Sequence, residues 1–166
     1  MQSKGDGRGK RQVFELLKIF EHMVNFNIER YLKFGSVYEF TNQTSENEIY
    51  SILGKPSEIE DYGKNGRFLH YENLRLTITN DRLKVADLFL MNSDVNYTLG
   101  QDGEVLQINR KTSLLKILYF FNNSSLKWHI PFDKFKLDYL LVEVSSGLSI
   151  FYYYGTEELE RISRIW

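Results

Sequence analysis

The segment NLRLTITNDRLKVADLFL, Asn73–Leu90, decides the fold class of this chain. Its first half alternates apolar and polar residues, so one face of the segment is expected to be buried and the other wet. The apolar positions are Leu74, Leu76 and Ile78. Asn80-Asp81 predicts a hairpin turn before a second apolar run. Together with FLHYEN, Phe68–Asn73, the segment predicts three consecutive antiparallel strands.

The same order of elements occurs twice along the chain. TSENEIYSILG, Thr44–Gly54, aligns with TSLLKILYFFN, Thr112–Asn122. Each of these predicts a short helix with an apolar stripe, and either residue of its leading Thr-Ser pair suits the N-cap. NLRLTITNDRLKVA then aligns with GLSIFYYYGTEELERI, Gly147–Ile162. Each half therefore predicts a helix, a loop and a three-stranded meander, as expected of a duplicated unit.

These patterns predict an α+β fold. Two helix-plus-β-meander repeats are expected to form one antiparallel sheet, with the helices on one face and an extra N-terminal helix. The other face is expected to stay open to solvent or to a partner. We predict a flexible tail over residues 1–11 and a single α+β domain over residues 12–166. Within the domain, the N-terminal helix and link, the first repeat, the connection and the second repeat are assigned to residues 12–43, 44–91, 92–111 and 112–166.

Several segments have no clear strand pattern. The N-terminal helix is expected from Gln12 to about Lys33, and Val37–Thr41 is expected as a short strand or an extended link. The residues between the first predicted helix and Arg67 are rich in Gly, Lys and Asn and are expected to form a loop. Residues 92–110 are expected to form a polar connection with a turn at Gln101-Asp102-Gly103.

The composition is typical of a water-soluble globular protein. Of the 166 residues, 42% are hydrophobic and 26% are charged, and the net charge is -1. A net charge this close to zero gives no overall electrostatic attraction to nucleic acid or to anionic lipid. The sequence contains no run of about 18 apolar residues, as a membrane-spanning helix needs, and its polar N-terminus lacks a signal-peptide core. We therefore predict a cytoplasmic protein that binds neither membranes nor nucleic acid.

Motifs of known catalytic chemistry are missing from the sequence. It has no cysteine, which excludes thiolate catalysis and cysteine-ligated zinc. His22, His70 and His129 have no metal-site spacing around them, and neither a P-loop nor a GxSxG motif occurs. We predict that the protein is not an enzyme and uses no cofactor and no metal.

The aromatic run in SGLSIFYYYGTEELERIS, Ser146–Ser163, divides between two faces of its predicted strand. Because side chains alternate along a strand, one set is expected to point into the core with the residues aligned to Leu74 and Leu76. That set is Leu148, Ile150, Tyr152 and Tyr154. Phe151 and Tyr153 are expected on the opposite face, together with Arg75.

Three stretches carry a resemblance to a known family. They are LGKPSEI (Leu53–Ile59), FLHYENLRLTITNDRLKVADLFL (Phe68–Leu90) and SGLSIFYYYGTEELERIS. Over residues 44–166 the chain resembles bacterial immunity proteins of polymorphic and contact-dependent toxin systems. More distantly, it is similar to the tandem helix-plus-sheet layout of the β-lactamase inhibitor protein. The resemblance implies a protein without catalysis that neutralises a toxin domain by covering its surface.

Such a protein needs a rigid surface with aromatic anchors and complementary charge. We expect the open sheet face to supply Phe151, Tyr153, Arg75, Lys84 and Asp87. The acidic turn with Glu157 and Glu158 is a further candidate, suited to a basic nuclease toxin.

Two other functions remain open on the sequence alone. One is a structural or adaptor module with the same fold and another partner. The other is a small-ligand-binding protein with a cavity between helices and sheet, for which His70 and Tyr71 are candidate lining residues.

Overall fold

The computed structural model describes residues 27–91, 97–101, 104–134 and 138–166. The predicted tail over residues 1–11 and most of the predicted N-terminal helix lie outside these ranges. Helix α2, Ile28–Phe34, occupies the last part of the predicted range, but it is a helix of its own. The prediction of one continuous helix to Lys33 is wrong at Asn27, which has an extended backbone and caps α2 by accepting from the Arg30 amide.

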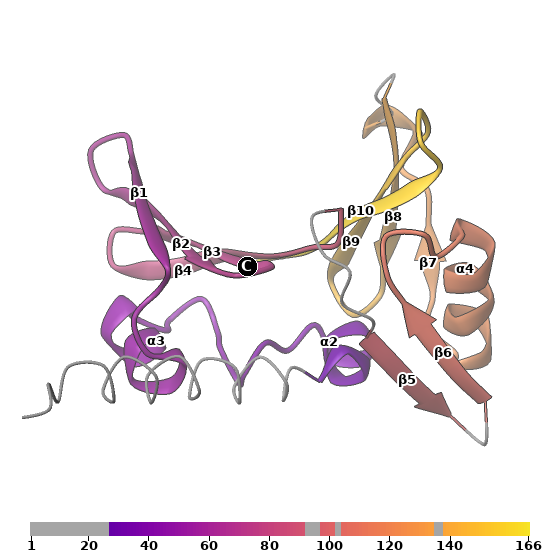
Figure 1. The fold of residues 1–166 in the computed structure, drawn as a ribbon, viewed down its shortest axis with the longest axis horizontal. Coiled ribbons are helices and arrows are strands. Elements are labelled where there is room, and N and C mark those ends of the chain that lie inside the picture. The colour runs from indigo at the N-terminus through magenta and orange to yellow at the C-terminus, as the bar shows by residue number, and fades with distance from the viewer. Residues whose placement is uncertain (1–26, 92–96, 102–103, 135–137) are drawn as a thin grey trace, which may run out of the picture.

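The described chain has an α+β fold, as predicted, with an antiparallel eight-stranded sheet (Figure 1). The sheet order is β1-β2-β3-β4-β10-β9-β8-β7. Its strands are β1 Glu58–Tyr62, β2 Gly66–Tyr71, β3 Leu74–Thr79, β4 Arg82–Phe89, β7 Trp128–His129, β8 Tyr139–Val144, β9 Leu148–Tyr153 and β10 Glu158–Ile165. The other helices are α3 Glu46–Leu53, α4 Leu114–Asn123 and the 3-10 turn η1 Phe132–Lys134. A separate two-stranded sheet consists of β5 Tyr97–Gln101 and β6 Glu104–Ile108.

The segment that decides the fold class forms β3 and β4, and the preceding residues form β2, as predicted. Asn80 and Asp81 both have positive φ angles, 51° and 57°, which is the backbone of a tight hairpin turn. The three alternating apolar residues of β3 are all buried in the core. Alternation and turn chemistry together therefore determined this part of the sheet.

Two sequence expectations about loops are wrong. Strand β1 occupies part of the predicted loop before Arg67, and β5 and β6 occupy the predicted polar connection. All five residues of β1 are exposed, so no apolar alternation marks it, and backbone pairing with β2 holds it in place. The segment Val37–Thr41 forms turns rather than a strand, with positive φ angles at Tyr38 and Glu39.

The two halves of the sheet meet at a central seam, where β4 pairs with β10 (Figure 1). Five residues of each strand are in register, from Val85 opposite Ile165 to Phe89 opposite Arg161. On one side of this seam lie β1 to β3, preceded by α3, and on the other lie β7 to β9, preceded by α4. Each half thus contributes four strands to the sheet, whereas the sequence predicted three. Duplication of the halves and placement of their helices on one face stay predictions.

A buried tyrosine from α2 holds the seam. Tyr31 is fully buried, and its single O–H is shared between the carbonyl oxygens of Ala86 in β4 and Ile162 in β10, at 3.0 and 3.2 Å. Burial raises the pKa of Tyr31 well above its ordinary value. The hydroxyl thus links the helix to both halves of the sheet at the line where they join.

The first turn of α3 is closed by a capping box. The Ser45 side chain accepts a hydrogen bond from the Glu48 amide at 3.3 Å, and the Glu48 carboxylate accepts one from the Ser45 amide at 2.7 Å. These bonds from Ser45 lower the pKa of Glu48. The stabilisation from the ionised carboxylate is therefore present above the ordinary glutamate pKa and is lost as pH falls through the lowered one.

We expect Ser45→Ala to lower the free energy of unfolding by about 0.5–2 kcal/mol, because an amide at the helix start loses its acceptor. Urea unfolding at neutral pH measures the change. Asn47→Ala, an exposed change in the same helix turn, is the matched control and should not destabilise. The deficit of Ser45→Ala should shrink in acid, because the Ser45 hydroxyl also donates to the Glu48 carboxylate at 2.8 Å. An equal deficit at all pH values would contradict a role for that bond.

Candidate functional site

One row of stacked side chains crosses the sheet on the face opposite the buried side chains of β3. We call it the arginine–aromatic ladder, and each of its seven members comes from a different strand, in the order β1, β2, β3, β4, β10, β9 and β8. Its members are Tyr62, Phe68, Arg75, Phe89, Arg161, Phe151 and Tyr139.

The spacing along the ladder is that of aromatic stacking and cation–π contact. The rings of Tyr62 and Phe68 stack with centroids 4.4 Å apart. The Arg75 guanidinium carbon lies 4.9 Å from the centre of the Phe68 ring and 4.8 Å from that of Phe89. At the other end, the centroids of Phe151 and Tyr139 are 5.5 Å apart, edge to face.

Arg161 continues the ladder across the seam. Its guanidinium carbon lies 5.7 Å from the centre of the Phe89 ring and 4.2 Å from that of Phe151. Strand register explains this arrangement, because Phe89, Arg161 and Phe151 are directly opposite one another on β4, β10 and β9. A register shift between Leu159 and Arg161 lets Leu159 and Ile162 both enter the core while Arg161 stays on the ladder face.

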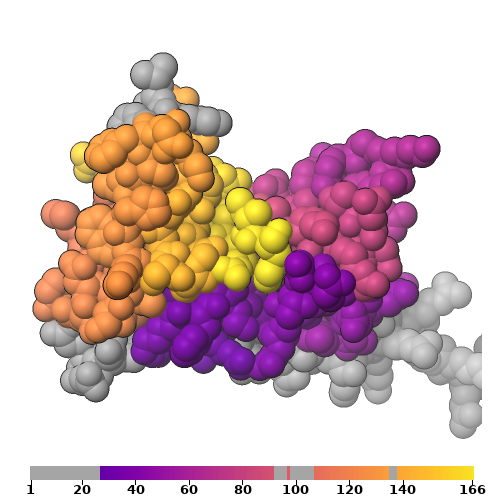
Figure 2. Space-filling view, turned by 180° about the vertical axis from the view of Figure 1, so that it is seen from behind, coloured from indigo at the N-terminus to yellow at the C-terminus, as the bar shows by residue number. Residues whose placement is uncertain are grey.

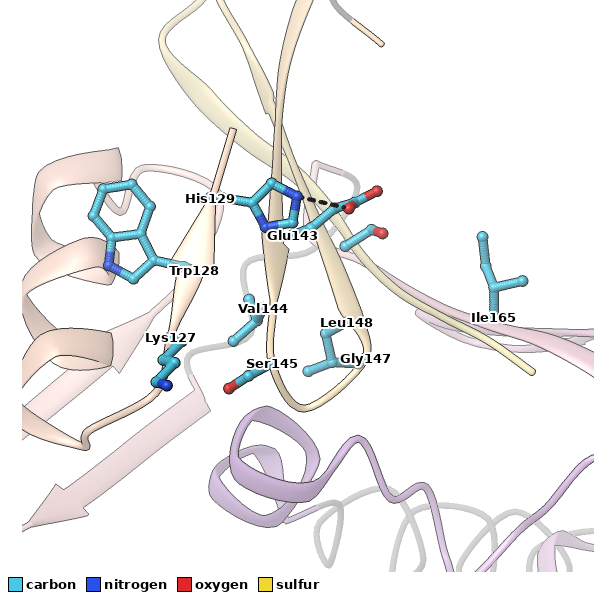
Figure 3. Close-up of a pocket in the computed structure, with 10 residues that line it drawn as sticks. Lys127, Trp128, His129, Glu143, Val144, Ser145, Gly147, Leu148 and Ile165 are labelled. Atoms are coloured by element: carbon cyan, nitrogen blue, oxygen red, sulfur yellow. Dashed lines mark ion pairs between the residues drawn. The ribbon is translucent and has the colours of Figure 1, made fainter. Parts of the chain in front are cut away.

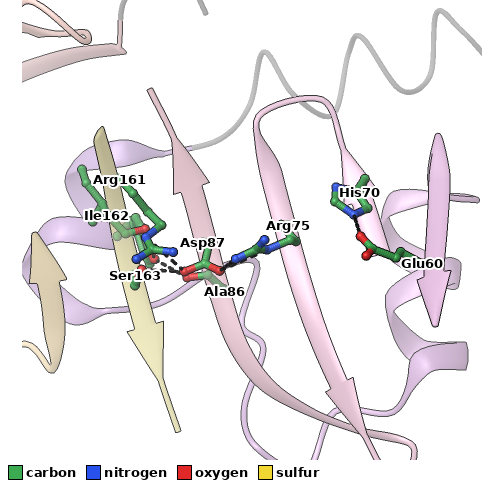
Figure 4. A network of polar contacts seen from close by, with 9 residues as sticks. Glu60, His70, Arg75, Ala86, Asp87, Arg161, Ile162 and Ser163 are labelled. Atoms are coloured by element: carbon green, nitrogen blue, oxygen red, sulfur yellow. Dashed lines mark hydrogen bonds and ion pairs between the residues drawn. The ribbon is translucent and has the colours of Figure 1, made fainter. Parts of the chain in front are cut away.

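Asp87 holds the centre of this face (Figure 4). It is buried, and its carboxylate accepts from Arg75 Nη2 at 2.8 Å and from the Ser163 hydroxyl at 2.5 Å. A buried carboxylate is tolerated because it is paired and hydrogen-bonded. The consequence is a fixed position for Arg75 between its two rings.

The sequence-predicted site residues fall into two groups. Arg75, Asp87 and Phe151 lie together in and around the ladder, and half-buried Tyr153 is on the same face, opposite Tyr139 in the strand register. Asp87 is enclosed rather than exposed, so its contacts are with Arg75 and Ser163.

The remaining predicted residues lie away from the ladder. Lys84 is at the irregularity of the β3–β4 pairing, where its carbonyl accepts from the Trp166 amide. Glu157 is exposed in the turn between β9 and β10, and Glu158 follows it at the start of β10, 3.9 Å from Arg110. These glutamates therefore form a second, separate surface.

The core assignment of the tyrosine run is partly wrong. Leu148 and Ile150 are buried, and Tyr152 packs partly against the core with its hydroxyl donating to the Glu157 carbonyl at 2.7 Å. Tyr154, predicted to be in the core, is exposed. The reason is that β9 ends at Tyr153, after which the chain turns and strand alternation no longer applies.

The ladder face is hollowed. In Figure 1 the sheet curves upward at β1 on one side and at β8 to β10 on the other, with α2 and α3 below it. The space-filling view from behind shows a notch between the part coloured for β1 to β4 and the part coloured for β8 to β10 (Figure 2). A concave sheet face of this kind can receive a convex surface of another molecule.

A pocket of about 350 Å³ opens at the β7–β8–β9 end of the sheet (Figure 3). Its polar lining includes His129, whose Nε2 lies 3.2 Å from a Glu143 carboxylate oxygen, and Lys127. The other oxygen of Glu143 accepts from Lys134 Nζ at 2.7 Å. Among the described residues, no group of three or more His, Cys, Asp or Glu side chains is arranged to hold a metal ion.

The predicted ligand-lining pair, His70 and Tyr71, does not share a cavity. As neighbours on β2 they point to opposite faces of the sheet. Tyr71 is buried and donates to the Gly54 carbonyl at 3.0 Å, whereas His70 lies 3.7 Å from Glu60 on the ladder face.

Within the described ranges, no helix has the length and apolarity needed to cross a membrane.

Sequence reasoning missed most of the ladder. Phe68 lies two positions before His70 and Phe89 two positions after Asp87, so each is in phase with a residue that the sequence had singled out. The alternation rule places Phe89 on the face of Asp87, but the irregularity in β10 hides the phase of Arg161.

Comparison with known proteins yields no relative. No family model, no curated protein and no solved structure matches the chain significantly.

Proposed function

We propose that this chain is a protein-binding protein without catalysis, which neutralises a bacterial toxin by covering part of its surface. The observation that carries the proposal is the arginine–aromatic ladder on a concave sheet face. The motifs that resemble immunity proteins supply the toxin part of the proposal. The helix side of the sheet acts as the scaffold, and the ladder side as the binding surface.

The residue types of the ladder are those that dominate binding energy in protein interfaces. Arginine and the large aromatic residues are enriched at hot spots, where they are packed by neighbours that exclude water. Stacking already restricts the rotamers of Arg75, Arg161 and the Phe89 ring between them. Less side-chain entropy is therefore lost on binding than for freely rotating side chains.

Affinity capture from the source bacterium tests the proposal. The wild-type chain is used beside Phe151→Ala, Tyr153→Ala and the control Tyr119→Ala on the exposed face of α4. We expect one protein to bind the wild type and the control. Its affinity for the two ladder-face variants should fall by about 30-fold or more, as for a hot-spot residue. Circular dichroism confirms that each variant is folded.

Toxicity separates an immunity protein from an adaptor. The captured protein is expressed in a heterologous bacterium with and without this chain. Growth arrest that the wild type relieves, and Phe151→Ala relieves poorly, supports neutralisation. A captured protein that never impairs growth identifies an adaptor instead, and capture that is equal for all variants rules out the ladder face.

The pocket lined by Lys127, His129 and Glu143 supports the second candidate, a small-ligand-binding protein. His129 of β7 and Glu143 of β8 lie side by side in its wall, and its volume of about 350 Å³ is within the range of small-molecule sites (Figure 3). Thermal-shift screening of a metabolite library against wild type and His129→Ala tests it. A ligand that stabilises only the wild type would favour this function over protein binding.

A further inference from the structure

The two arginines of the ladder have different partners. Arg75 is paired with Asp87 through two contacts, at 2.8 and 3.3 Å. Arg161 makes no hydrogen bond with its side chain among the described residues, and its Nε is buried without a partner. The nearest carboxylate oxygen, on Asp87, lies 3.9 Å from that Nε, which is too long for a hydrogen bond.

The centre of the ladder face therefore carries an uncompensated positive charge. Arg75, Asp87 and Arg161 contribute two positive charges and one negative. Asp87 is engaged by Arg75 and Ser163. Farther along the same face, the Glu143 carboxylate is held by His129 and Lys134, and Glu60 lies beside His70 at the β1 edge.

The surroundings of Arg161 orient it for recognition of a planar anion. Its guanidinium lies between the rings of Phe89 and Phe151, and 22% of its side chain is exposed. Contact with aromatic rings engages the faces of a guanidinium and leaves its N–H edge free for an in-plane, bidentate carboxylate. The flanking rings would cover the methylene groups of an aspartate or glutamate side chain.

From this arrangement we propose that Arg161 receives an aspartate or glutamate carboxylate from an acidic loop of the partner protein. The inference rests on the proposed function and deepens it, because it states the chemistry of the partner's contact. The single uncompensated positive charge of the Arg75, Asp87 and Arg161 group would be neutralised by one carboxylate, which carries a single negative charge. A nucleic-acid backbone would instead require a series of cations along the face, and the described ladder has only the two arginines, of which one is paired.

The direct test is an NMR titration that follows the arginine side-chain ¹⁵N–H resonances of the full chain. The probes are the capped peptide acetyl-Gly-Glu-Gly-amide, its glutamine analogue and inorganic phosphate. We expect the glutamate peptide to shift the Arg161 resonance saturably and the glutamine peptide to leave it unchanged. Arg161→Gln should abolish the response, whereas Arg67→Gln, which removes a cation paired with Glu46 and Asp61, should not.

Two results would overturn the inference. One is the absence of any saturable Arg161 shift, or equal shifts with the glutamate and glutamine peptides. The other is tighter binding of phosphate than of the glutamate peptide, which would assign the site to phosphate groups. Arg161→Lys, which keeps the charge but loses the bidentate fork, should bind the peptide more weakly than wild type.

The protein partner, once captured, separates this inference from the proposed function. Arg161→Gln should weaken the complex by at least about 30-fold, since it removes one side of an enclosed charge pair. A complex that is lost with Phe151→Ala but unaffected by Arg161→Gln would leave the function standing and end this inference. Binding of the glutamate peptide at Arg161, with no protein captured from the bacterium, would support a carboxylate site there and count against the proposed function.

Discussion

Tyr31→Ala is expected to lower the free energy of unfolding by about 3–5 kcal/mol, the cost of truncating a fully buried aromatic side chain. Tyr31 has no exposed surface, and its ring lies in the core that joins α2 to the sheet. The change also removes the hydroxyl that donates to both strands of the seam. Chemical unfolding, monitored by circular dichroism, measures the loss.

Tyr31→Phe isolates the hydroxyl from the ring. It should cost about 1–3 kcal/mol, because two buried carbonyl groups lose the one donor that they share while packing is kept. Burial raises the pKa of the Tyr31 phenol, so its contribution is fully present below the ordinary tyrosine pKa and is lost as pH rises through the raised one. The wild type should therefore lose stability faster than Tyr31→Phe in alkali.

The control for both changes is Tyr119→Ala, which truncates an exposed tyrosine of α4 and should alter stability by no more than about 0.5 kcal/mol. A Tyr31→Phe protein as stable as the wild type at every pH would show that the seam does not need the hydroxyl. A Tyr31→Ala protein that unfolds at the wild-type midpoint would show that α2 does not support the sheet.

Asp87→Ala is expected to cost about 3–5 kcal/mol, as is usual when one partner of a buried ion pair is removed. The carboxylate is 5% exposed and accepts from Arg75 and from the Ser163 hydroxyl. Without it, the ladder face would hold two arginines and no nearby anion. We expect Arg75 to leave its position between the rings, so partner binding should also fall.

A double-mutant cycle distinguishes lost pairing from lost packing. If unpaired charge is the main cost, Asp87→Ala combined with Arg75→Met should be more stable than Asp87→Ala alone. Asp61→Ala, which removes the exposed carboxylate of the Arg67 pair, is the matched control and should cost no more than about 1 kcal/mol. Strictly additive losses would contradict a coupled network around Asp87.

Strands that bury one face in regular alternation were predictable from sequence, and β1, which buries no side chain, was not. β3 and β9 place their leucines and isoleucines in the core with the period of a strand. β1 leaves every side chain exposed, so its position depends on the edge of β2 and has no local signal. The separate β5–β6 sheet was missed because the polar composition of its segment favoured a loop.

The candidate site was predictable only in part for a related reason. Arg75 and Phe151 follow from alternation because their strands are regular up to those residues. Arg161 does not, since a register shift changes the phase of β10 just before it. The pairing of β4 with β10 brings Phe89 beside Arg161, and such a long-range contact leaves no trace in local sequence periodicity.

The position of β10 also has a consequence for biosynthesis. It lies in the middle of the sheet, yet it is the last of the eight strands to emerge from the ribosome. Until it emerges, β4 and β9 each expose an unpaired edge, and Tyr31 lacks one of its two carbonyl acceptors. Because unpaired edges and exposed apolar surface favour association, the nascent chain passes through an aggregation-prone stage that ends only when β10 is inserted.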